Sequence, residues 1–403
     1  MVPKGWKRIS IKDACEAIID CVNKTAPVVD YETNFKMLRT TNIRNGRVDT
    51  QSVRYVTEET YLQWVKRGKP QKGDIIFTRE APVGEVGILE DDNGVFLGQR
   101  TMMYRTNTDV ADNYYLFYSL LSEYCQKQID NFCNGGTVAH MRVPDCGEIL
   151  INTPSLIEQK KIAKILSTWD KAITTTEQLL VNSQQQKKAL MQQLLTSKKR
   201  FPGFSDKWKK TTLGAVANMS SGGTPTSSVK EYYNGGIPWV SISDMTSQGK
   251  WIISTDKTLS IIGLENSSAK LYPENTILYA MYASIGECSI ARVPLCSSQA
   301  ILGIRPKQDL HYEYLYFFLS HLKERIKLQG QQGTQSNLNA GMVKKFSILL
   351  PSLEEQKAIS TSLNIADQEI ETLKQKLNHL KQEKKALMQQ LLTGKRRVKT
   401  EAA

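Results

Sequence analysis

The sequence has few of the features that mark membrane, secreted or metal-binding proteins. Its 403 residues include no run of about 18 apolar residues, the length that a membrane-spanning helix needs. The first residues lack the apolar stretch of a signal peptide. The seven cysteines form no C-x-x-C pair and only four histidines occur, so neither a disulfide framework nor a metal site is indicated. We therefore expect a cytoplasmic protein that binds no metal.

Sequence motifs of nucleotide-dependent enzymes are also missing. Neither G-x-x-x-x-G-K-[ST] nor G-x-G-x-x-G occurs, and no stretch is similar to the Asn-Pro-Pro-Tyr of amino-methyltransferases. Pro144 and Asp145, followed by residues 158–160, imitate the carboxylate motif of nucleases. Because residues 158–160 recur at 355–357 without an upstream Pro-Asp pair, we interpret them as the start of a helix. The sequence predicts a chain with no catalytic site.

Acidic residues are outnumbered by basic ones. The chain has 53 Lys and Arg against 40 Asp and Glu, which gives a net charge of +13. Such an excess favours a polyanionic partner, either nucleic acid or an anionic membrane surface, although a merely basic protein is the alternative. With 40% hydrophobic and 23% charged residues, the chain is expected to fold, and its length suits two domains or more.

A single internal repeat divides the chain. The ten residues KKALMQQLLT at 187–196 recur letter for letter at 384–393. Residues 154–160 match residues 351–357 at the same spacing, so each half is a globular segment followed by a helix. The predicted domains are a first globular domain at 1–154, a central helix at 155–200, a second globular domain at 201–351 and a C-terminal helix at 352–397.

The two helical segments, 155–196 and 352–393, repeat apolar residues at the heptad spacing of a coiled coil. Ser155 precedes Glu158, and Ser352 precedes Glu355, by the three residues of a capping box. Because one chain supplies two matched helices, we expect an intramolecular antiparallel pair rather than a generic dimerisation coil. The residues expected in the helix seam and partner surface are Ile162, Leu166, Ile173, Leu180, Leu190, Leu194, Ile359, Leu363, Ile370, Leu377, Leu387 and Leu391.

Basic clusters follow both helices. Residues 198–200 end the first helix and lead into a short linker, and residues 395–399 form a tail that we expect to fray. Both clusters are expected to be solvated rather than bound to phosphate.

Each globular segment mixes strand and helix patterns. Residues 73–78 and 85–89 are patterned as strands, and residues 114–121 and 312–322 as helices, which predicts an α+β domain. Arg, Asn and Gln on loops can form paired hydrogen bonds with base edges, and Ser and Thr reach phosphates. Ordinary surface loops are the alternative. The candidate DNA-binding residues are Arg39, Thr41, Asn42, Arg44, Arg47, Arg79, Arg100, Thr137, His140, Arg142, Ser241, Ser243, Tyr282, Gln299, Thr334, Gln335, Asn337 and Lys344.

Taken together, these motifs resemble the specificity subunits of type I restriction–modification systems. The motifs are the Pro3-Lys4-Gly5-Trp6 opening, Gly73-Asp74-Ile75-Ile76 before a strand, Gly-Thr loops that lead to 154–159, and the helix ending at 190–196. The resemblance covers the whole chain, twice. It implies an α+β fold with two tandem target-recognition domains, separated by two long conserved helices that form an antiparallel coiled coil with pseudo-twofold symmetry.

The resemblance also implies a function. Each recognition domain would read one half of a bipartite site on double-stranded DNA, while the helices set the spacer and dock two methyltransferase subunits. Restriction subunits would join later. S-adenosylmethionine would bind to the methyltransferase subunits, ATP and Mg²⁺ would serve the restriction subunits, and this chain would bind no cofactor. The alternative is a non-catalytic coiled-coil scaffold whose globular ends bind protein.

One departure distinguishes the two halves. The second has Gly-Thr-Gln-Ser-Asn-Leu at 333–338 where the first has Gly-Thr-Val-Ala-His-Met at 136–141. If this loop contacts DNA, the two domains should read different sequences. We expect His140 to be a polar loop contact rather than a catalytic base.

Overall fold

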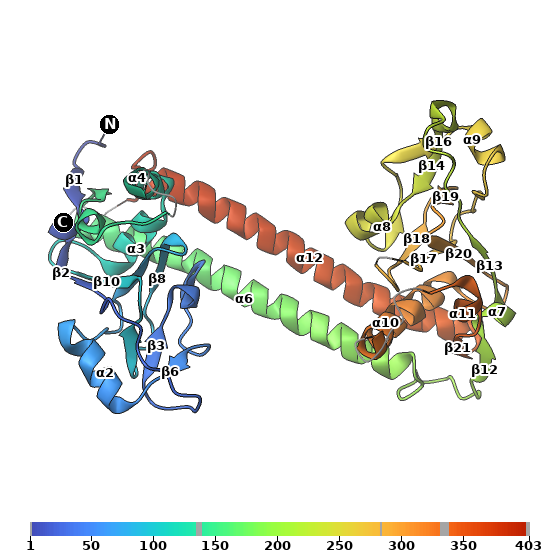
Figure 1. The fold of residues 1–403 in the computed structure, drawn as a ribbon, viewed down its shortest axis with the longest axis horizontal. Helices are drawn as coiled ribbons and strands as arrows, with labels where there is room; N and C mark the ends of the chain where they lie inside the picture. Colours follow the sequence, from blue (N-terminus) through green and yellow to red (C-terminus); the bar gives the residue numbers. More distant parts are fainter. Residues whose placement is uncertain (1, 134–138, 283, 331–337, 400–403) are drawn as a thin grey trace. The chain divides into compact units, whose positions relative to one another are not determined.

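The chain folds into two compact units. The computed structural model describes residues 2–133, 139–282, 284–330 and 338–399, apart from the side chains of 324–330. The first unit comprises residues Met1–Glu177 and Gln375–Ala403, and the second comprises Gln178–Lys374. Each of two long helices, α6 (Leu156–Leu194) and α12 (Leu353–Leu391), therefore gives one half to each unit (Figure 1).

The first unit is an α+β domain joined to the first half of α6 and the second half of α12. Its strands are β1 (Lys7–Ser10), β2 (Cys15–Asp20), β3 (Lys36–Leu38), β4 (Ile43–Arg44), β5 (Gly46–Val48), β6 (Arg54–Tyr55), β7 (Ile75–Arg79), β8 (Val83–Ile88), β9 (Val95–Leu97), β10 (Thr101–Thr106) and β11 (Leu150–Thr153). Its other helices are α1 (Ile11–Ala14), α2 (Glu58–Trp64), α3 (Asn113–Leu121), α4 (Glu123–Cys133) and α5 (Val143–Gly147), with 3-10 turns at Thr40–Asn42 and Val65–Arg67.

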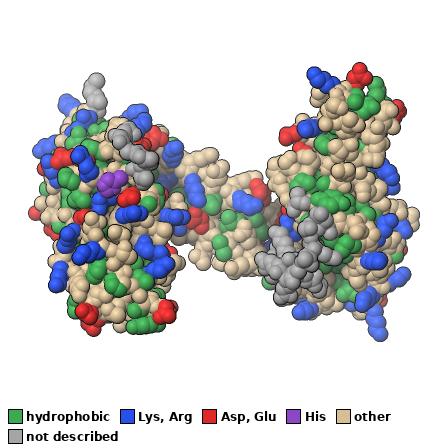
Figure 2. Space-filling view, in the orientation of Figure 1, with side chains coloured by type: hydrophobic (Ala, Val, Ile, Leu, Met, Phe, Trp, Pro, Cys, Tyr) green, Lys and Arg blue, Asp and Glu red, His purple; other side chains and the backbone are tan. Residues whose placement is uncertain are grey.

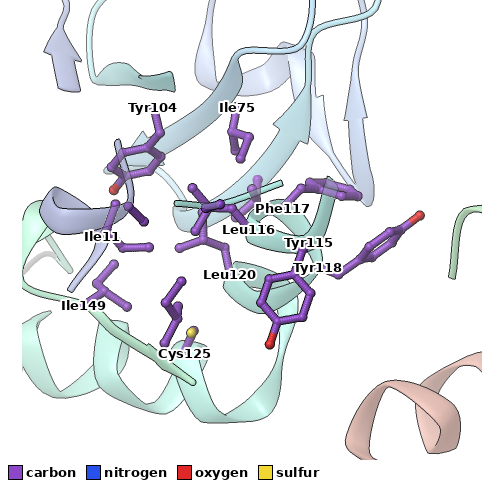
Figure 3. Packing of buried hydrophobic residues seen from close by; sticks show 14 of the residues in the cluster. Ile11, Ile75, Tyr104, Tyr115, Leu116, Phe117, Tyr118, Leu120, Cys125 and Ile149 are labelled. Carbon is purple, nitrogen blue, oxygen red and sulfur yellow. The ribbon is translucent and has the colours of Figure 1, made fainter. Parts of the chain in front are cut away.

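The main sheet of this unit has six strands in the order β2-β10-β7-β8-β5-β4, and β6-β3-β9 form a second sheet. Alternation along β7 explains why a separate core lies on each face of this sheet, because neighbouring side chains of a strand face opposite sides of the sheet. Ile75 and Phe77 enter the larger core with α3, whereas Ile76 packs with Leu38 and Val95. Figure 3 shows the larger core, where Ile75 and Tyr104 lie over the side chains of α3.

The second unit repeats this plan. Its strands are β12 (Lys209–Thr212), β13 (Ala217–Ser221), β14 (Tyr233–Val240), β15 (Trp251–Ile252), β16 (Lys257–Leu259), β17 (Ile277–Ala280), β18 (Cys288–Ala291), β19 (Cys296–Ser297), β20 (Ile301–Pro306) and β21 (Ser347–Leu350). Its other helices are α7 (Leu213–Val216), α8 (Ile242–Gln248), α9 (Ile261–Glu265), α10 (Tyr312–Gly330) and α11 (Ala340–Lys344), with a 3-10 turn at Lys230–Tyr232.

The sheets of the two units correspond strand by strand. The order β13-β20-β17-β18-β15 in the second unit follows β2-β10-β7-β8-β5 in the first, and β16-β14-β19 follows β6-β3-β9. The alternation is also kept, because Ile277 and Tyr279 enter the core with α10 while Leu278 enters the other core. The expected α+β fold with an internal repeat is confirmed.

Within each unit, half of α6 runs antiparallel to half of α12. In the first unit, Ile162 and Leu166 of α6 share a core with Leu391 of α12. In the second unit, Leu194 of α6 shares a core with Ile359 and Leu363 of α12. The expected antiparallel helix pair is confirmed, and the apolar seam is extended at each end by the core of a globular domain. Leu180, Leu190, Leu377 and Leu387 are only half-buried, while Ile173 and Ile370 are buried.

A glutamine at the start of each long helix ties that helix to its unit. The Gln159 amide, which is 1% exposed, accepts from the backbone N–H of Asp112 and donates to the carbonyls of Val110 and Pro154. Gln356, fully buried, makes the matching set with His311, Asp309 and Pro351. A buried amide with all its partners satisfied positions the backbone it contacts.

The neighbouring glutamates bind basic residues that follow the other helix. Arg397, after α12, forms a two-pronged pair with Glu158 at 2.7 and 2.8 Å. Arg200, after α6, forms the same pair with Glu355 at 2.8 and 2.7 Å. Each arginine also lies over a tryptophan ring, Trp6 or Trp208.

These pairs correct two expectations. The hydroxyl half of each capping box forms, since Ser155 and Ser352 accept from the backbone N–H of Glu158 and Glu355. The glutamate side chains bind arginine instead of turning back to the cap. Arg200 and Arg397 are consequently paired with carboxylates rather than only solvated, and the tail at 395–399 is docked through Arg397 rather than frayed. Charge-assisted pairs to buried carboxylates outweigh the entropy of a free tail.

Replacing Gln356 with leucine should destabilise the second unit by about 2–4 kcal/mol, because one buried N–H and two carbonyls lose their partner. Urea denaturation of the full chain, followed by fluorescence, measures this change. Gln368→Leu on the exposed face of the same helix is the matched control and should change stability by less than about 0.5 kcal/mol. Equal effects of the two substitutions would contradict the assigned role of Gln356.

Candidate DNA-binding surface

Three loops of the first unit meet at one edge through backbone hydrogen bonds. The N–H of Gly98 donates to the carbonyl of Leu38 at 2.7 Å, which ties the end of β9 to the end of β3. The N–H of Arg79 donates to Arg100 at 2.9 Å, and the N–H of Met141 donates to Arg79 at 3.0 Å. The ends of β3, β7 and β9 are thereby held beside the segment that precedes α5.

The second unit builds the same edge from different residues. The N–H of Ser298 donates to Val240 at 2.9 Å, and the N–H of Met281 donates to Ala300 at 2.9 Å. The N–H of Leu338 donates to Met281 at 3.0 Å. Both units therefore share one backbone framework, which we call the recognition edge, while its side chains differ.

Two of the candidate residues on the first recognition edge are joined by a carboxylate. Glu80, which follows β7, lies 3.3 Å from the guanidinium of Arg100 and 3.7 Å from Nδ1 of His140. Arg100 and His140 are both exposed, so their polar atoms remain accessible to a ligand. Glu80 is absent from the residues expected from the sequence, because those were basic, amide and hydroxyl side chains. The internal repeat could have indicated it, since Glu80 corresponds to the candidate Tyr282 in the second half.

Arg79 lies at the same edge but points into the protein. Its side chain is buried, its guanidinium pairs with Asp20 at 2.9 Å, and it donates to the carbonyl of Met141 at 3.4 Å. Asn42 is similar, since its buried side chain accepts from the N–H of Arg39 and donates to Ser52. In this structure both side chains hold loops in place.

The remaining candidates of the first unit spread over several surfaces. Thr41 is exposed on the 3-10 turn that carries Asn42, Arg44 is exposed at the end of β4, and Arg39 is half-buried. Arg47 turns to α6, where it binds Thr174 at 2.8 Å and Glu177 at 3.0 Å. Arg142 is exposed and pairs with Asp145 at 2.7 Å. Thr137 lies outside the described residues.

In the second unit, four candidates lie at the recognition edge or beside it. Ser241 caps α8 and its hydroxyl lies 2.8 Å from that of Ser243. Gln299 is exposed between the edge residues Ser298 and Ala300, and exposed Tyr282 follows Met281. Lys344 is exposed at the end of α11, a helix that contacts α7 and β13. Thr334, Gln335 and Asn337 lie outside the described residues.

Charge is distributed in small groups rather than in one basic field. On the face shown in Figure 2, lysine and arginine side chains are interspersed with aspartate and glutamate over both globular parts. The net excess of +13 is therefore spread over many sites. Such a distribution suits contacts to separate phosphates more than a single anionic ligand.

Other kinds of site find little support in the described part of the chain. No group of three or more His, Cys, Asp or Glu residues there is placed to hold a metal ion. Burial raises the pKa of the Cys125 thiol to about 12, which leaves it protonated and unreactive near neutral pH. Among the described helices, none has the length and apolar character needed to cross a membrane.

Comparison with known proteins identifies the family. The sequence profile of the type I restriction modification DNA specificity domain matches residues 3–182 and again residues 205–382. The chain belongs to this family. Its two matches coincide with the internal repeat, and its role is that of a subunit that confers DNA sequence specificity on a type I restriction–modification system.

Relatives of this family match along the whole chain or along part of it. A putative type I restriction enzyme specificity subunit, MjaX of Methanocaldococcus jannaschii, is 27% identical over 425 residues, covering 99% of this chain and 95% of the relative. The HindI specificity subunit of Haemophilus influenzae is 31% identical over 150 residues, covering 36% of this chain and 32% of the relative.

Solved structures show the same fold. One, from work on assembly and conformational transition of the type I R-M system, has a TM-score of 0.61 at 19% identity and covers 97% of this chain and 98% of that one. The S subunit of a type I system from M. genitalium has a TM-score of 0.60 at 18% identity, with 97% and 96% coverage.

Arg79 and Arg44 should respond differently to substitution. Arg79→Met leaves Asp20 without its close partner and should destabilise the first unit by about 2–3 kcal/mol, as measured by urea denaturation. Arg44→Ala should change stability by less than about 0.5 kcal/mol. If Arg44 contacts a phosphate, the slope of log affinity for DNA against log salt should fall by about 0.9. Equal loss of stability in both variants would show that the assignment of Arg79 to a structural role is wrong.

Proposed function

We propose that each unit reads one half of a bipartite site on double-stranded DNA through its recognition edge. The observation that carries the proposal is the shared backbone framework with different side chains in the two units. A common framework presents loops in the same way, while different side chains select different bases. The edge of the first unit offers Arg100 and His140, and that of the second offers Ser241, Tyr282 and Gln299.

The helix pair serves a second purpose in this proposal. The reciprocal pairs Arg397–Glu158 and Arg200–Glu355 give each unit the same helix arrangement. Two surfaces with the same helix arrangement on one chain suit two copies of one partner, in the way that symmetric assemblies use matching interfaces. We assign these surfaces to two methyltransferase subunits and assign the spacing of the two half-sites to the helices.

In the assembly, the chain places chemistry that other subunits perform. It binds no cofactor itself and is not an enzyme. The methyltransferase subunits bind S-adenosylmethionine, and restriction subunits use ATP and Mg²⁺. The complex acts on chromosomal DNA in the cytoplasm. The scaffold alternative, in which the globular ends bind only protein, has no observation that favours it over DNA recognition.

Mapping of methylated bases tests the proposal directly. Genomic DNA is sequenced by a long-read method from cells that carry the chain with its methyltransferase, and from cells that lack only the chain. We expect one gapped two-part motif to be methylated when the chain is present and to vanish without it. A folded, co-purifying complex that produces no sequence-specific methylation would contradict the proposal and favour the scaffold.

Exchange of one globular segment tests the modular arrangement. Replacing residues 201–351 with the matching segment of another specificity subunit should change one half of the methylated motif and leave the other half unchanged, because each recognition edge belongs to one unit. The same mapping measures the outcome, and exchange of residues 1–154 is the reciprocal control. A swap that altered both halves of the motif would refute independent reading.

A further inference from the structure

An ammonium group occupies an aromatic cage in the second unit. Nζ of Lys250, the residue before β15, lies 4.5 Å from the ring centre of Phe317, 4.8 Å from that of Trp251 and 5.1 Å from that of Tyr316. These distances lie within the range of a favourable cation–π contact. The ammonium also pairs with Glu313 at 3.3 Å and donates to Asn364 of α12.

The cage encloses the Lys250 ammonium almost completely. The side chain of Lys250 is only 13% exposed. Burial lowers the pKa of Lys250, and Glu313 opposes that shift. The second unit therefore fills the space between β15, α10 and α12 with a cation of its own.

The internal repeat shows which residues take these places in the first unit. Arg47 pairs with Ile88 in the same register as Trp251 with Ile290, so Gly46 corresponds to Lys250. On the covering helix, Tyr115 and Tyr314 make matching hydrogen bonds to the strand behind them. Along the helices the counterparts of Glu313, Tyr316, Phe317 and Asn364 are Tyr114, Phe117, Tyr118 and Ser167.

These counterparts line an open pocket. A cavity of about 990 Å³ in the first unit is bordered by Gly46, Phe117, Tyr118 and Ser167, together with Tyr114. A Cβ at Gly46 would meet the ring of Phe117 at 3.2 Å, so a side chain there would face the same ring that Lys250 faces in the other unit. Two of the three rings of the cage, Phe117 and Tyr118, are present in the first unit, and Arg47 stands in the place of Trp251. Lys384 lies 5.2 Å from the ring centre of Tyr118, as Lys187 lies 5.8 Å from that of Phe317. The lysine that fills the cage in the second unit, Lys250, has no counterpart side chain at Gly46.

One charged position beside the pocket differs in sign between the two units. The hydroxyl of Tyr114 donates to Glu90 at 2.6 Å, so Glu90 brings a carboxylate to the place that Glu313 serves in the second unit. Glu90 also replaces Arg292, which lies 3.9 Å over Trp251 in the other unit. One positive charge is thus exchanged for a negative one beside the cage.

The cations that line the pocket are mostly committed to other carboxylates. Arg47 and Lys381 both bind Glu177, at 3.0 and 2.9 Å. Lys384 binds Asp170 at 2.6 Å. Lys171 also lines the pocket, with an exposed side chain. No cation pairs with Glu90 among the residues that the structure describes.

We propose that this pocket receives the ammonium group of a lysine from a partner protein, in the place that Lys250 fills in the second unit. The identity of the partner rests on the proposed function, which makes it the methyltransferase subunit bound to the first unit. Two identical methyltransferase subunits then meet an open cage on one unit and a filled cage on the other. The two docking surfaces are consequently not equivalent.

Methyl NMR of the full chain tests the cage with n-butylammonium as the probe. Ile88 and Ile173 line the pocket, and Ile370 is the counterpart of Ile173 in the second unit. We expect saturable shifts of the Ile88 and Ile173 methyl signals with a dissociation constant on the order of 1–10 mM. The Ile370 signal should not move. No saturable shift, or an equal response to 1-butanol, would overturn the proposal by showing no site or a merely apolar one.

Variants locate the binding site. Ser167→Leu should block the pocket and weaken binding of the probe by at least about tenfold, the effect of losing most contacts of so small a ligand. Thr168→Leu, on the next exposed position of α6, is the matched control and should leave binding unchanged. Lys250→Gly should make Ile370 responsive to the probe. Undiminished binding to the folded Ser167→Leu chain would overturn the assignment, and the wild-type titration decides the proposal even if Lys250→Gly fails to fold.

The assembled complex separates this inference from the proposed function. In a complex of the chain with its methyltransferase subunits, the Ile88 and Ile173 signals should no longer respond to n-butylammonium, because the partner lysine occupies the cage. A complex that methylates a gapped motif but still binds the probe at this pocket would overturn the inference and leave the proposed function intact. A complex that excludes the probe yet methylates no motif would contradict the proposed function and leave the inference about the cage intact.

Discussion

The crossed attachment of the two long helices is the constraint on which the rest of the structure depends. Each helix begins in one unit and ends in the other, so neither unit is complete without residues from both repeats. Gln159 and Glu158 start α6 in the first unit, where Arg397 from the end of the chain completes the carboxylate pair. Gln356, Glu355 and Arg200 do the same in the second unit. A carboxylate buried without a partner destabilises the folded chain. The fold therefore strongly favours pairing the start of each long helix with the residues that follow the other one.

This constraint explains why the two helices diverge so little while the globular parts diverge so much. A residue in the helix pair contacts its own domain and the partner helix, so few substitutions satisfy both. Asp170 shows this, since it accepts from Tyr118 of the domain and from Lys384 of the partner helix. The exposed residues on the recognition edge, unlike buried Arg79, have no such double duty. Their backbone bonds keep the loops in place, and their side chains are free to change.

The two units share one backbone arrangement, but the side chains at equivalent positions differ. Lys250 and Gly46 occupy equivalent positions, yet one fills an aromatic cage and the other leaves a pocket beside the same helix faces. Such differences matter for a protein that presents two similar surfaces, because they let identical partners be held in two distinct ways. The asymmetry is invisible in the motif pattern, since the aligned strands around Gly46 and Lys250 share almost no letters.

The sequence by itself determined the number of repeats, the two long helices and the alternation of the strands. These features follow from local periodicity, which is written in consecutive residues, and the helices at 155–196 and 352–393 are found within two residues of their predicted ends. It also indicated the family, because the Pro-Lys-Gly-Trp opening, the Gly-Asp-Ile-Ile stretch, the Gly-Thr loops and the helix ending occur in one order. The candidate DNA-binding residues stay predictions, and loop chemistry alone could not separate exposed Arg44 from buried Arg79.

Only the tertiary structure decided that Arg79 and Asn42 hold loops, that Glu158 and Glu355 bind distant arginines, and that the basic tail is docked. The physical reason is that burial and charge pairing depend on partners elsewhere in the chain, 62 positions away for Arg79 and Met141 and 155 and 239 positions away for the two glutamate–arginine pairs, and no local pattern specifies such a partner.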